Sequence, residues 1–352
     1  MKLQERSMPP NRAPKDQSIE TLRGIAIILV VGYHLKADQP LAEYRDLYEY
    51  LAYSFQNIRM PLFTVISGYL YGLRPTSPGE GIPFLRGKAR RIALPLIVVA
   101  TLQYVATALL PGVNNPESLS DIWRIYVFPY EHFWFLQSIL LVFLTVTALE
   151  VLRAMQSLRG WFLCLMVSAA AFLFAPRVPA ARDLFSFGGY VYLMPFFLIG
   201  LGSARFPAML QSRQAATTAA VTLLVCLGIQ QAAWFLDVPI DTGKRALLGL
   251  TTAAAACIAL MGFRFTFAPL AFVGAHAYTI YLYQGFGSAF GRRIVGLLDE
   301  VHPHAYFALV LGMTIMFGIL LEMVVRKTRF LRTPLLGLRP RRRGTRIPDM
   351  AT

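Results

Sequence analysis

Charged residues are scarce in this chain of 352 residues: only 15% are Asp, Glu, Lys or Arg, while 56% are hydrophobic. A water-soluble domain has about 25% charged residues, so this composition excludes an ordinary soluble fold. It also excludes a disordered chain and a nucleic-acid-binding domain built on charge, because both need many more polar residues.

Paired cysteines and several common catalytic motifs are missing as well. The three cysteines stand singly in apolar stretches, which indicates small buried side chains rather than disulfides or metal ligands. The chain contains no HExxH, GxSxG or P-loop motif, so zinc hydrolase, serine hydrolase and ATPase functions have no support. The spacing of histidines, cysteines and acidic residues predicts no metal site.

Long apolar runs fill most of the sequence instead. About 20 apolar residues cross a bilayer as a helix, and these runs lack the alternating polarity of a membrane β-barrel. We therefore predict an all-α integral membrane protein, a bundle of about ten transmembrane helices. The expected spans are 19–35, 51–73, 92–112, 133–152, 160–176, 187–204, 215–236, 246–262, 270–290 and 305–325.

The basic residues gather on one side of these spans. With the N-terminus placed inside, 24 of the 34 Lys and Arg residues fall in inner segments, and the acidic residues show the opposite bias. By the positive-inside rule this pattern predicts that both termini are cytoplasmic. The expected organisation is a cytoplasmic tail over 1–18, a transmembrane domain over 19–325 and a basic cytoplasmic tail over 326–352. We expect that last tail to contact anionic lipid rather than nucleic acid.

Two ionisable residues of the first span, Arg23 and His34, lie eleven positions apart. Eleven α-helical steps come within about 20° of three full turns and cover about 16.5 Å, so both side chains share one face. This arrangement places an anion-binding group at the cytoplasmic end and a titratable base deeper in the membrane. It suits coenzyme A, which has phosphates at one end and a thioester at the other. Two roles are open for His34: a catalytic base, or a hydrogen-bonded packing residue.

A second basic group, which includes Arg86, Arg90 and Arg91, precedes the third span. Arg86 and Arg90 are four positions apart and are expected to share a helical face. The arginine guanidinium can bind two phosphate oxygens at once. Two interpretations of this group are therefore possible: a cytoplasmic phosphate site, or simple topological anchoring. Arg59 falls within the second predicted span, where it either snorkels to the outer interface or faces a polar cavity.

Five residues are secondary candidates for a substrate-lining cavity, and most of them also fit structural roles. For Ser67 and its neighbour Gly68, close helix packing is the simpler interpretation. For Trp134, with His132 before it, an interfacial belt is simpler, and for His276 a hydrogen-bonded packing role. The five candidates are Glu20, Arg59, Ser67, Trp134 and His276.

The segment IETLRGIAIILVVGYH resembles the opening signature of the acyltransferase-3 family, polytopic bacterial membrane enzymes that O-acylate carbohydrates. The family's Arg–ten residues–His motif falls on Arg23 and His34. Further blocks resemble the family in the same order, and together they cover roughly 17–325. They are MPLFTVISGYLYG, RGKARRIALPLI, FWFLQSILLVF, PFFLIGLGSARF and FVGAHAYTIYLYQ.

This resemblance implies a ten-helix core in the bacterial inner membrane, a cytoplasmic acyl-CoA donor and His34 as catalytic base. It implies that Arg23 and the Arg86, Arg90 and Arg91 group bind the donor. The acyl group is expected to be acetyl or another short acyl group, the acceptor a carbohydrate or glycolipid, and no cofactor is expected to stay bound. The chain departs from the family at two positions: Glu20 stands where Asp is frequent, and Gln284 where many relatives have His.

The function predicted from the sequence is therefore O-acyl transfer from acyl-CoA to a carbohydrate hydroxyl. A transporter or exporter of a small anion or glycolipid is the alternative, since the same intramembrane charges suit a substrate path. The absence of a visible internal repeat argues mildly against it. A receptor or scaffold, in which these residues are structural, is a third possibility. The sequence leaves the acceptor, the acyl group, the role of Gln284 and the oligomeric state open.

Overall fold

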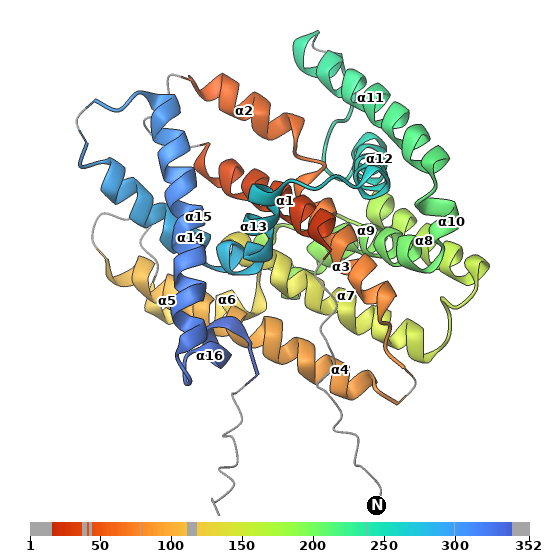
Figure 1. Ribbon diagram of the computed structural model, residues 1–352, viewed down its shortest axis with the longest axis horizontal. Coiled ribbons are helices and arrows are strands. Elements are labelled where there is room, and N and C mark those ends of the chain that lie inside the picture. Colours follow the sequence, from red (N-terminus) through yellow and green to blue (C-terminus); the bar gives the residue numbers. More distant parts are fainter. Residues whose placement is uncertain are drawn as a thin grey trace, which may run out of the picture.

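The computed structural model of the chain is helical throughout the residues that it describes, with no β-strand among them (Figure 1). The described residues are 16–36, 41, 44–77, 79–110, 118–236, 238–298 and 300–339. The predictions for the first fifteen residues, and for the basic tail beyond residue 339, lie outside these ranges.

Sixteen α-helices follow one another along the described ranges. A π-helix, η2 (Ala89–Ala93), joins α4 to α5, and a 3₁₀ turn, η4 (Glu131–Phe133), leads into α7. The α-helices are α1 (Gln17–Leu35), α2 (Arg45–Ser54), α3 (Arg59–Leu73), α4 (Gly81–Lys88), α5 (Leu94–Leu109), α6 (Arg124–Val127), α7 (Trp134–Val151), α8 (Leu158–Phe174), α9 (Phe187–Arg205), α10 (Pro207–Leu210), α11 (Arg213–Phe235), α12 (Leu247–Phe263), α13 (Ala268–Ala275), α14 (Ala277–Val295), α15 (Pro303–Lys327) and α16 (Arg332–Leu336).

Several of these helices can cross a membrane, so the chain is a multi-pass membrane protein. Six helical segments of the described ranges are long and apolar enough, and α12 with α13 makes a seventh if this pair, bent by 117°, is one span. The count of ten spans and the cytoplasmic termini therefore stay predictions. The six segments are Gln17–Leu35, Gly81–Leu109, Leu119–Val151, Leu184–Arg205, Arg213–Phe235 and Pro303–Lys327.

Two predicted spans are interrupted in the structure. The one expected over 51–73 is divided by a turn between α2 and α3, and the one expected over 270–290 is divided at His276 between α13 and α14. With 15 residues, α3 extends about 22 Å, which is shorter than the hydrocarbon core of about 30 Å. An apolar run shows that a segment is suited to the membrane interior, but it does not fix where the helix breaks.

The centre of the bundle depends on a close approach between α3 and α9. A Cβ atom on Gly68 would collide with the backbone carbonyl of Phe197, and one on Gly200 with that of Val65. Because apolar side chains gain little by leaving lipid, small residues that let helix backbones touch are the usual means of packing in membranes. The predicted packing role of Gly68 is confirmed. Ser67 is half-buried, and its hydroxyl donates to the Phe63 carbonyl at 2.9 Å.

Helix α1 lies in the middle of the molecule, in contact with α3, α13, α14 and α15 (Figure 1). The Asp16 side chain caps it by accepting from the Ser18 backbone N–H at 3.0 Å. Gly274 of α13 fits directly against the α1 backbone at Glu20 and Gly24, where any larger residue would collide. These contacts fix the position of the helix that carries Arg23 and His34.

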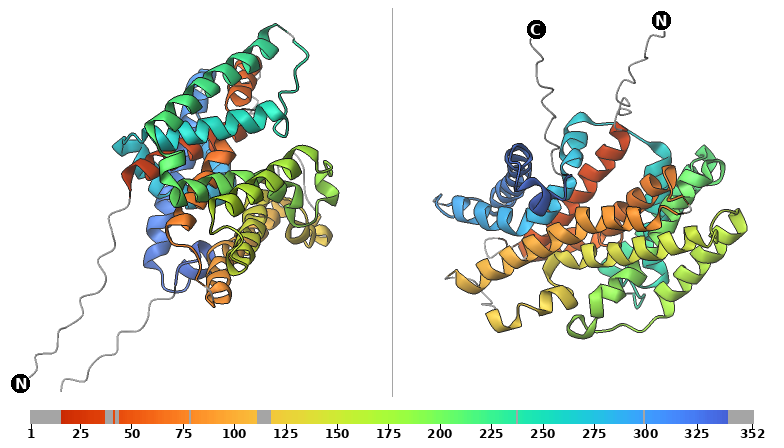
Figure 2. Two further views of the ribbon diagram at one scale, coloured as in Figure 1. Left: turned by 90° about the vertical axis from the view of Figure 1, so that its right-hand side faces the viewer. Right: turned by 90° about the horizontal axis from the view of Figure 1, so that it is seen from below.

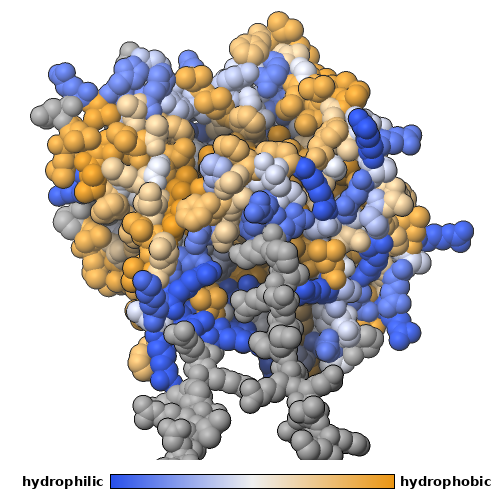
Figure 3. Space-filling view, in the orientation of Figure 1, coloured by the Kyte–Doolittle hydropathy of each residue, from blue (hydrophilic) through white to orange (hydrophobic). Residues whose placement is uncertain are grey.

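The outer helices present apolar side chains to the surroundings. On α11, for example, Val221, Leu224 and Val225 are exposed, and Figure 2 shows α11 and α12 side by side along one flank. Figure 3 shows apolar residues over much of one face and a group of hydrophilic residues in its lower part. Extensive exposed apolar surface of this kind is typical of a lipid-facing protein.

Candidate functional site

A cavity of about 890 Å³ opens where η2, the C-terminal end of α15 and α16 meet. This volume lies within the range of small-molecule binding sites, about 300–1,000 Å³. Six of its lining side chains are cationic and none is acidic. The basic cavity, as we call it, is lined by Lys88, Arg90, Arg91, Arg326, Arg332 and Arg339, together with Pro83, Phe84, Gly87, Gly337 and Leu338.

The local fold explains which arginines line the basic cavity. Arg90 and Arg91 belong to the π-helix, whereas Arg86 belongs to the preceding α-helix, is exposed and is absent from the lining. The predicted shared face of Arg86 and Arg90 assumed regular α-helical steps. A π-helix holds more residues per turn, so it changes the rotation between these two positions. Gly337 ends α16 with a φ of 63° and lies against the backbone of Arg91.

The cations of the basic cavity have few anionic partners within the described ranges. The Nε atoms of Arg90 and Arg332 are buried and have no hydrogen-bond acceptor there. The Lys88 ammonium lies 3.5 Å from the centre of the Phe143 ring, and Arg326 pairs with Glu322. Buried guanidinium N–H groups without acceptors favour an anion with several oxygens, such as a phosphate group.

His34 lies at the C-terminal end of α1, beside a second histidine. Its side chain is exposed, and its ring centre is 6.2 Å from that of His132, which is buried. The His132 ring nitrogen Nε2 lies 3.5 Å from the Leu282 carbonyl oxygen, and the Tyr281 hydroxyl donates to the His132 carbonyl. His132 sits in the turn η4, directly after Glu131, whose φ of 44° is unusual for a residue with a side chain.

The prediction of an interfacial belt is therefore wrong for His132, which packs inside the bundle. Sequence reasoning missed this residue as a neighbour of His34. The available signal was its position immediately before the FWFL block. That signal is ambiguous, because a histidine followed by aromatic residues is equally typical of a membrane interface and of a bundle interior.

One turn of α14 connects the basic cavity with the two histidines. The Tyr278 hydroxyl donates to the Arg91 carbonyl at 2.6 Å. Three positions further along α14, Tyr281 contacts His132. Residues three apart on a helix are neighbours on its surface. The backbone of Arg91, which lines the basic cavity, and that of His132 thus contact neighbouring positions of the same helical turn.

Arg59 and Trp134 both point into the protein. Arg59 is the first residue of α3, only 4% exposed, and its guanidinium carbon lies 3.6 Å from the centre of the Tyr33 ring. It does not snorkel to the interface. Trp134 is half-buried, and its ring centre is 6.4 Å from that of the buried Tyr192.

Arg23 and His276 make ion-pair or hydrogen-bond contacts away from the two histidines. Arg23 lies 3.2 Å from the Glu20 carboxylate on the same face of α1, and it is not part of the basic cavity lining. The His276 ring nitrogen Nδ1 lies 2.8 Å from a Glu322 oxygen. The predicted hydrogen-bonded role of His276 is confirmed, and its partner Glu322 also binds Arg326 at the basic cavity.

Gln284, the position where the family resemblance departs, is buried on α14. It is 3% exposed, and neither its amide oxygen nor its amide nitrogen has a partner within the described ranges. A buried amide without partners is costly, so this side chain is suited to hydrogen-bond a polar ligand that enters the bundle.

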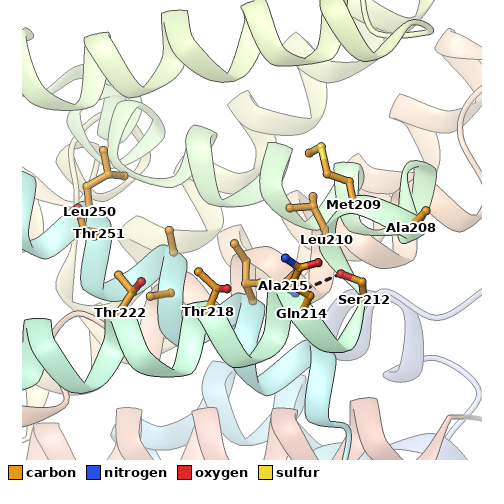
Figure 4. A pocket seen from close by; sticks show the side chains of 14 residues that line it. Ala208, Met209, Leu210, Ser212, Gln214, Ala215, Thr218, Thr222, Leu250 and Thr251 are labelled. Carbon is orange, nitrogen blue, oxygen red and sulfur yellow. Dashed lines mark hydrogen bonds between the residues drawn. The ribbon is translucent and has the colours of Figure 1, made fainter.

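A second hollow, of about 630 Å³, lies between α10, α11 and α12 (Figure 4). Its lining contains no ionisable side chain: it is formed by apolar residues with a few hydroxyl groups and one amide, such as Thr218, Thr222 and Gln214. It therefore offers neither a proton acceptor nor a cation, unlike the basic cavity and the two histidines.

Comparison with known proteins identifies the family of the chain. A family model described as an acyltransferase domain matches residues 16–323, nearly the whole chain. The chain belongs to the acyltransferase-3 family. No match was found among curated proteins. Family membership supports acyltransferase activity in general, and the match covers both α1 with His34 and the π-helix with Arg90 and Arg91.

Proposed function

We propose that this acyltransferase-3 protein moves a short acyl group, most simply acetyl, from cytoplasmic acyl-CoA to a hydroxyl of a cell-surface or lipid-linked carbohydrate at the bacterial inner membrane. The observation that carries the proposal is the basic cavity, connected through one turn of α14 to the His34–His132 pair. This arrangement provides an anion site and a proton acceptor that are linked by one turn of α14.

The donor end of the reaction uses the cations. The phosphates of coenzyme A bind Arg90, Arg91 and Arg332 in the basic cavity. The positive-inside pattern supports a cytoplasmic opening for this cavity. The pantetheine arm then follows α14 towards the histidines, where the amide of Gln284 is available to it. Arg23 is paired with Glu20 and does not line the basic cavity, so its part in donor binding rests on the family motif alone.

At the other end His34 acts as the general base. Its imidazole removes the proton of the acceptor hydroxyl as the hydroxyl oxygen attacks the thioester carbonyl carbon. The new C–O ester bond forms, the C–S bond breaks, and the coenzyme A thiolate leaves and takes up the proton from His34. The buried His132 packs against the His34 ring and helps to fix its orientation. In an alternative route, the acyl group is first transferred to His34 and then to the acceptor hydroxyl.

The test is glycan-dependent release of coenzyme A by the purified full-length protein in detergent. Wild type is compared with His34→Ala and with the control His302→Gln, which changes an exposed histidine. We expect activity to fall by about 10²–10⁴-fold in His34→Ala and to be unchanged in the control. Retained activity in His34→Ala would disprove the base assignment.

The same assay separates an enzyme from a transporter. Turnover by detergent-solubilised protein needs no sealed compartment, so a transporter of a small anion or glycolipid would release no coenzyme A. Mass spectrometry of His34 after incubation with acetyl-CoA alone distinguishes the two chemical routes, because only the acyl-histidine route adds an acetyl group to that residue.

A further inference from the structure

Three cations surround the ring of Tyr33, the residue next to His34. The Arg59 guanidinium carbon lies 3.6 Å from the ring centre, the Lys36 ammonium 5.0 Å and the Lys244 ammonium 5.7 Å. The three come from separate parts of the chain: the end of α1, the start of α3 and the segment before α12. We call these four residues the tyrosine cluster.

The tyrosine cluster gathers three cations, and among the described residues Glu49 is the carboxylate whose charge acts on one of them, Lys36. Within the described ranges no Asp or Glu forms an ion pair with Lys36, Arg59 or Lys244. Arg59 is 4% exposed, and among the described residues its polar contacts are the Tyr33 side chain and a long one, 3.5 Å, to the Ala52 carbonyl. A buried cation and two nearby cations repel one another, and the ring quadrupole compensates for only part of that cost. A bound anion would compensate for the rest.

The tyrosine cluster is adjacent to the reacting histidine and separate from the basic cavity. The ring centres of Tyr33 and His34 are 5.3 Å apart. None of the four residues lines the basic cavity. Lys244 and His34 are both exposed, so a molecule that approaches His34 from the protein surface also meets Lys244.

We propose that the tyrosine cluster binds an anionic oxygen group, a phosphate or a carboxylate, carried by the acyl acceptor, so that the acceptor is a negatively charged carbohydrate. This inference rests on the proposed function, since it assigns the acceptor of the same reaction. Arg59 supplies the fixed, paired donors and Lys244 the mobile ammonium. Together they hold the sugar with a hydroxyl near His34.

A binding measurement tests the inference without relying on turnover. The full-length protein in detergent is saturated with coenzyme A to occupy the basic cavity, and its thermal unfolding midpoint is followed with glucose 1-phosphate or with glucose. We expect glucose 1-phosphate to raise the midpoint and glucose to have no effect. Lys244→Gln and Arg59→Gln should remove the shift, whereas Arg182→Gln, an exposed arginine elsewhere, should keep it.

Transfer of labelled acetyl groups completes the test with envelope glycans separated into neutral and anionic fractions. We expect label in the anionic fraction, and a KM for that fraction raised at least tenfold in Lys244→Gln with the KM for acetyl-CoA unchanged. Lys244 is exposed, so its variant stays informative even if Arg59→Gln does not fold. Label confined to the neutral fraction, or a Lys244→Gln variant that keeps both the shift and the KM, would overturn the inference and leave the proposed function standing. No transfer to either fraction would overturn both.

Discussion

Replacement of Arg90 by Gln is the sharpest perturbation of the donor site. Arg90 is half-buried at the basic cavity and its Nε atom has no acceptor within the described ranges. Arg86 is four positions away, exposed and outside the lining. Arg86→Gln removes the same charge from the neighbouring helix and is therefore the matched control.

The expected size follows from the cavity. A hydrogen bond to a charged group contributes about 1.5–3 kcal/mol. Five other cations line the basic cavity and would share the proposed phosphates with Arg90, so the lower end of this range applies. A loss of about 1.5 kcal/mol corresponds to roughly tenfold weaker binding of the donor. For Arg86→Gln we expect a change of less than about twofold, because exposed charges in water interact weakly.

The assay compares KM for acetyl-CoA with KM for an acetyl-pantetheine that lacks the phosphates. Arg90→Gln should raise the KM for acetyl-CoA about tenfold. It should leave the KM for acetyl-pantetheine unchanged, because that substrate lacks the phosphates that Arg90 is proposed to bind. Equal effects of Arg86→Gln and Arg90→Gln would show that only the overall charge matters. An Arg90→Gln effect that persists with acetyl-pantetheine would refute a phosphate contact altogether.

Three further predictions follow from single positions. Gln284→Leu should leave the thermal unfolding midpoint equal or higher and raise the KM for acetyl-CoA several-fold, because its buried amide lacks protein partners. Gly68→Val should destabilise the protein by about 3 kcal/mol or more, measured as loss of the monodisperse fraction in detergent, since its Cβ meets backbone, while Gly312→Val, in open space, is tolerated. Partial loss of hydration around the ammonium, followed by the charge of Arg59, lowers the pKa of Lys244 below the 10.5 usual for lysine. Glucose 1-phosphate binding should therefore weaken as pH rises through that lowered pKa, at a lower pH than an ordinary lysine would give, and Lys244→Gln should remove this dependence.

The sequence alone predicted much of the candidate site but not its partners. The motif that contains Arg23 and His34 placed both on α1, and the basic group before the third span led to Arg90 and Arg91. It did not predict the arginines that the C-terminal region adds to the basic cavity, Arg326, Arg332 and Arg339. These positions are more than 230 residues away along the chain, and a run of basic residues near a terminus is as typical of simple topological anchoring.

The sequence by itself determined the class of the protein, because apolar runs of spanning length leave only helices as a stable structure in lipid. It also predicted which helix carries the proposed catalytic base, His34. Only the tertiary structure decided that His132 lies beside His34, that Arg59 is buried against Tyr33, and that α3 begins after a break. Hydropathy is a property of each residue and its near neighbours. Contacts between α1, α3, α9 and α13 depend on close approaches at a few small residues, such as Gly68 against α9 and Gly274 against α1. The partners of these residues cannot be read from one segment alone.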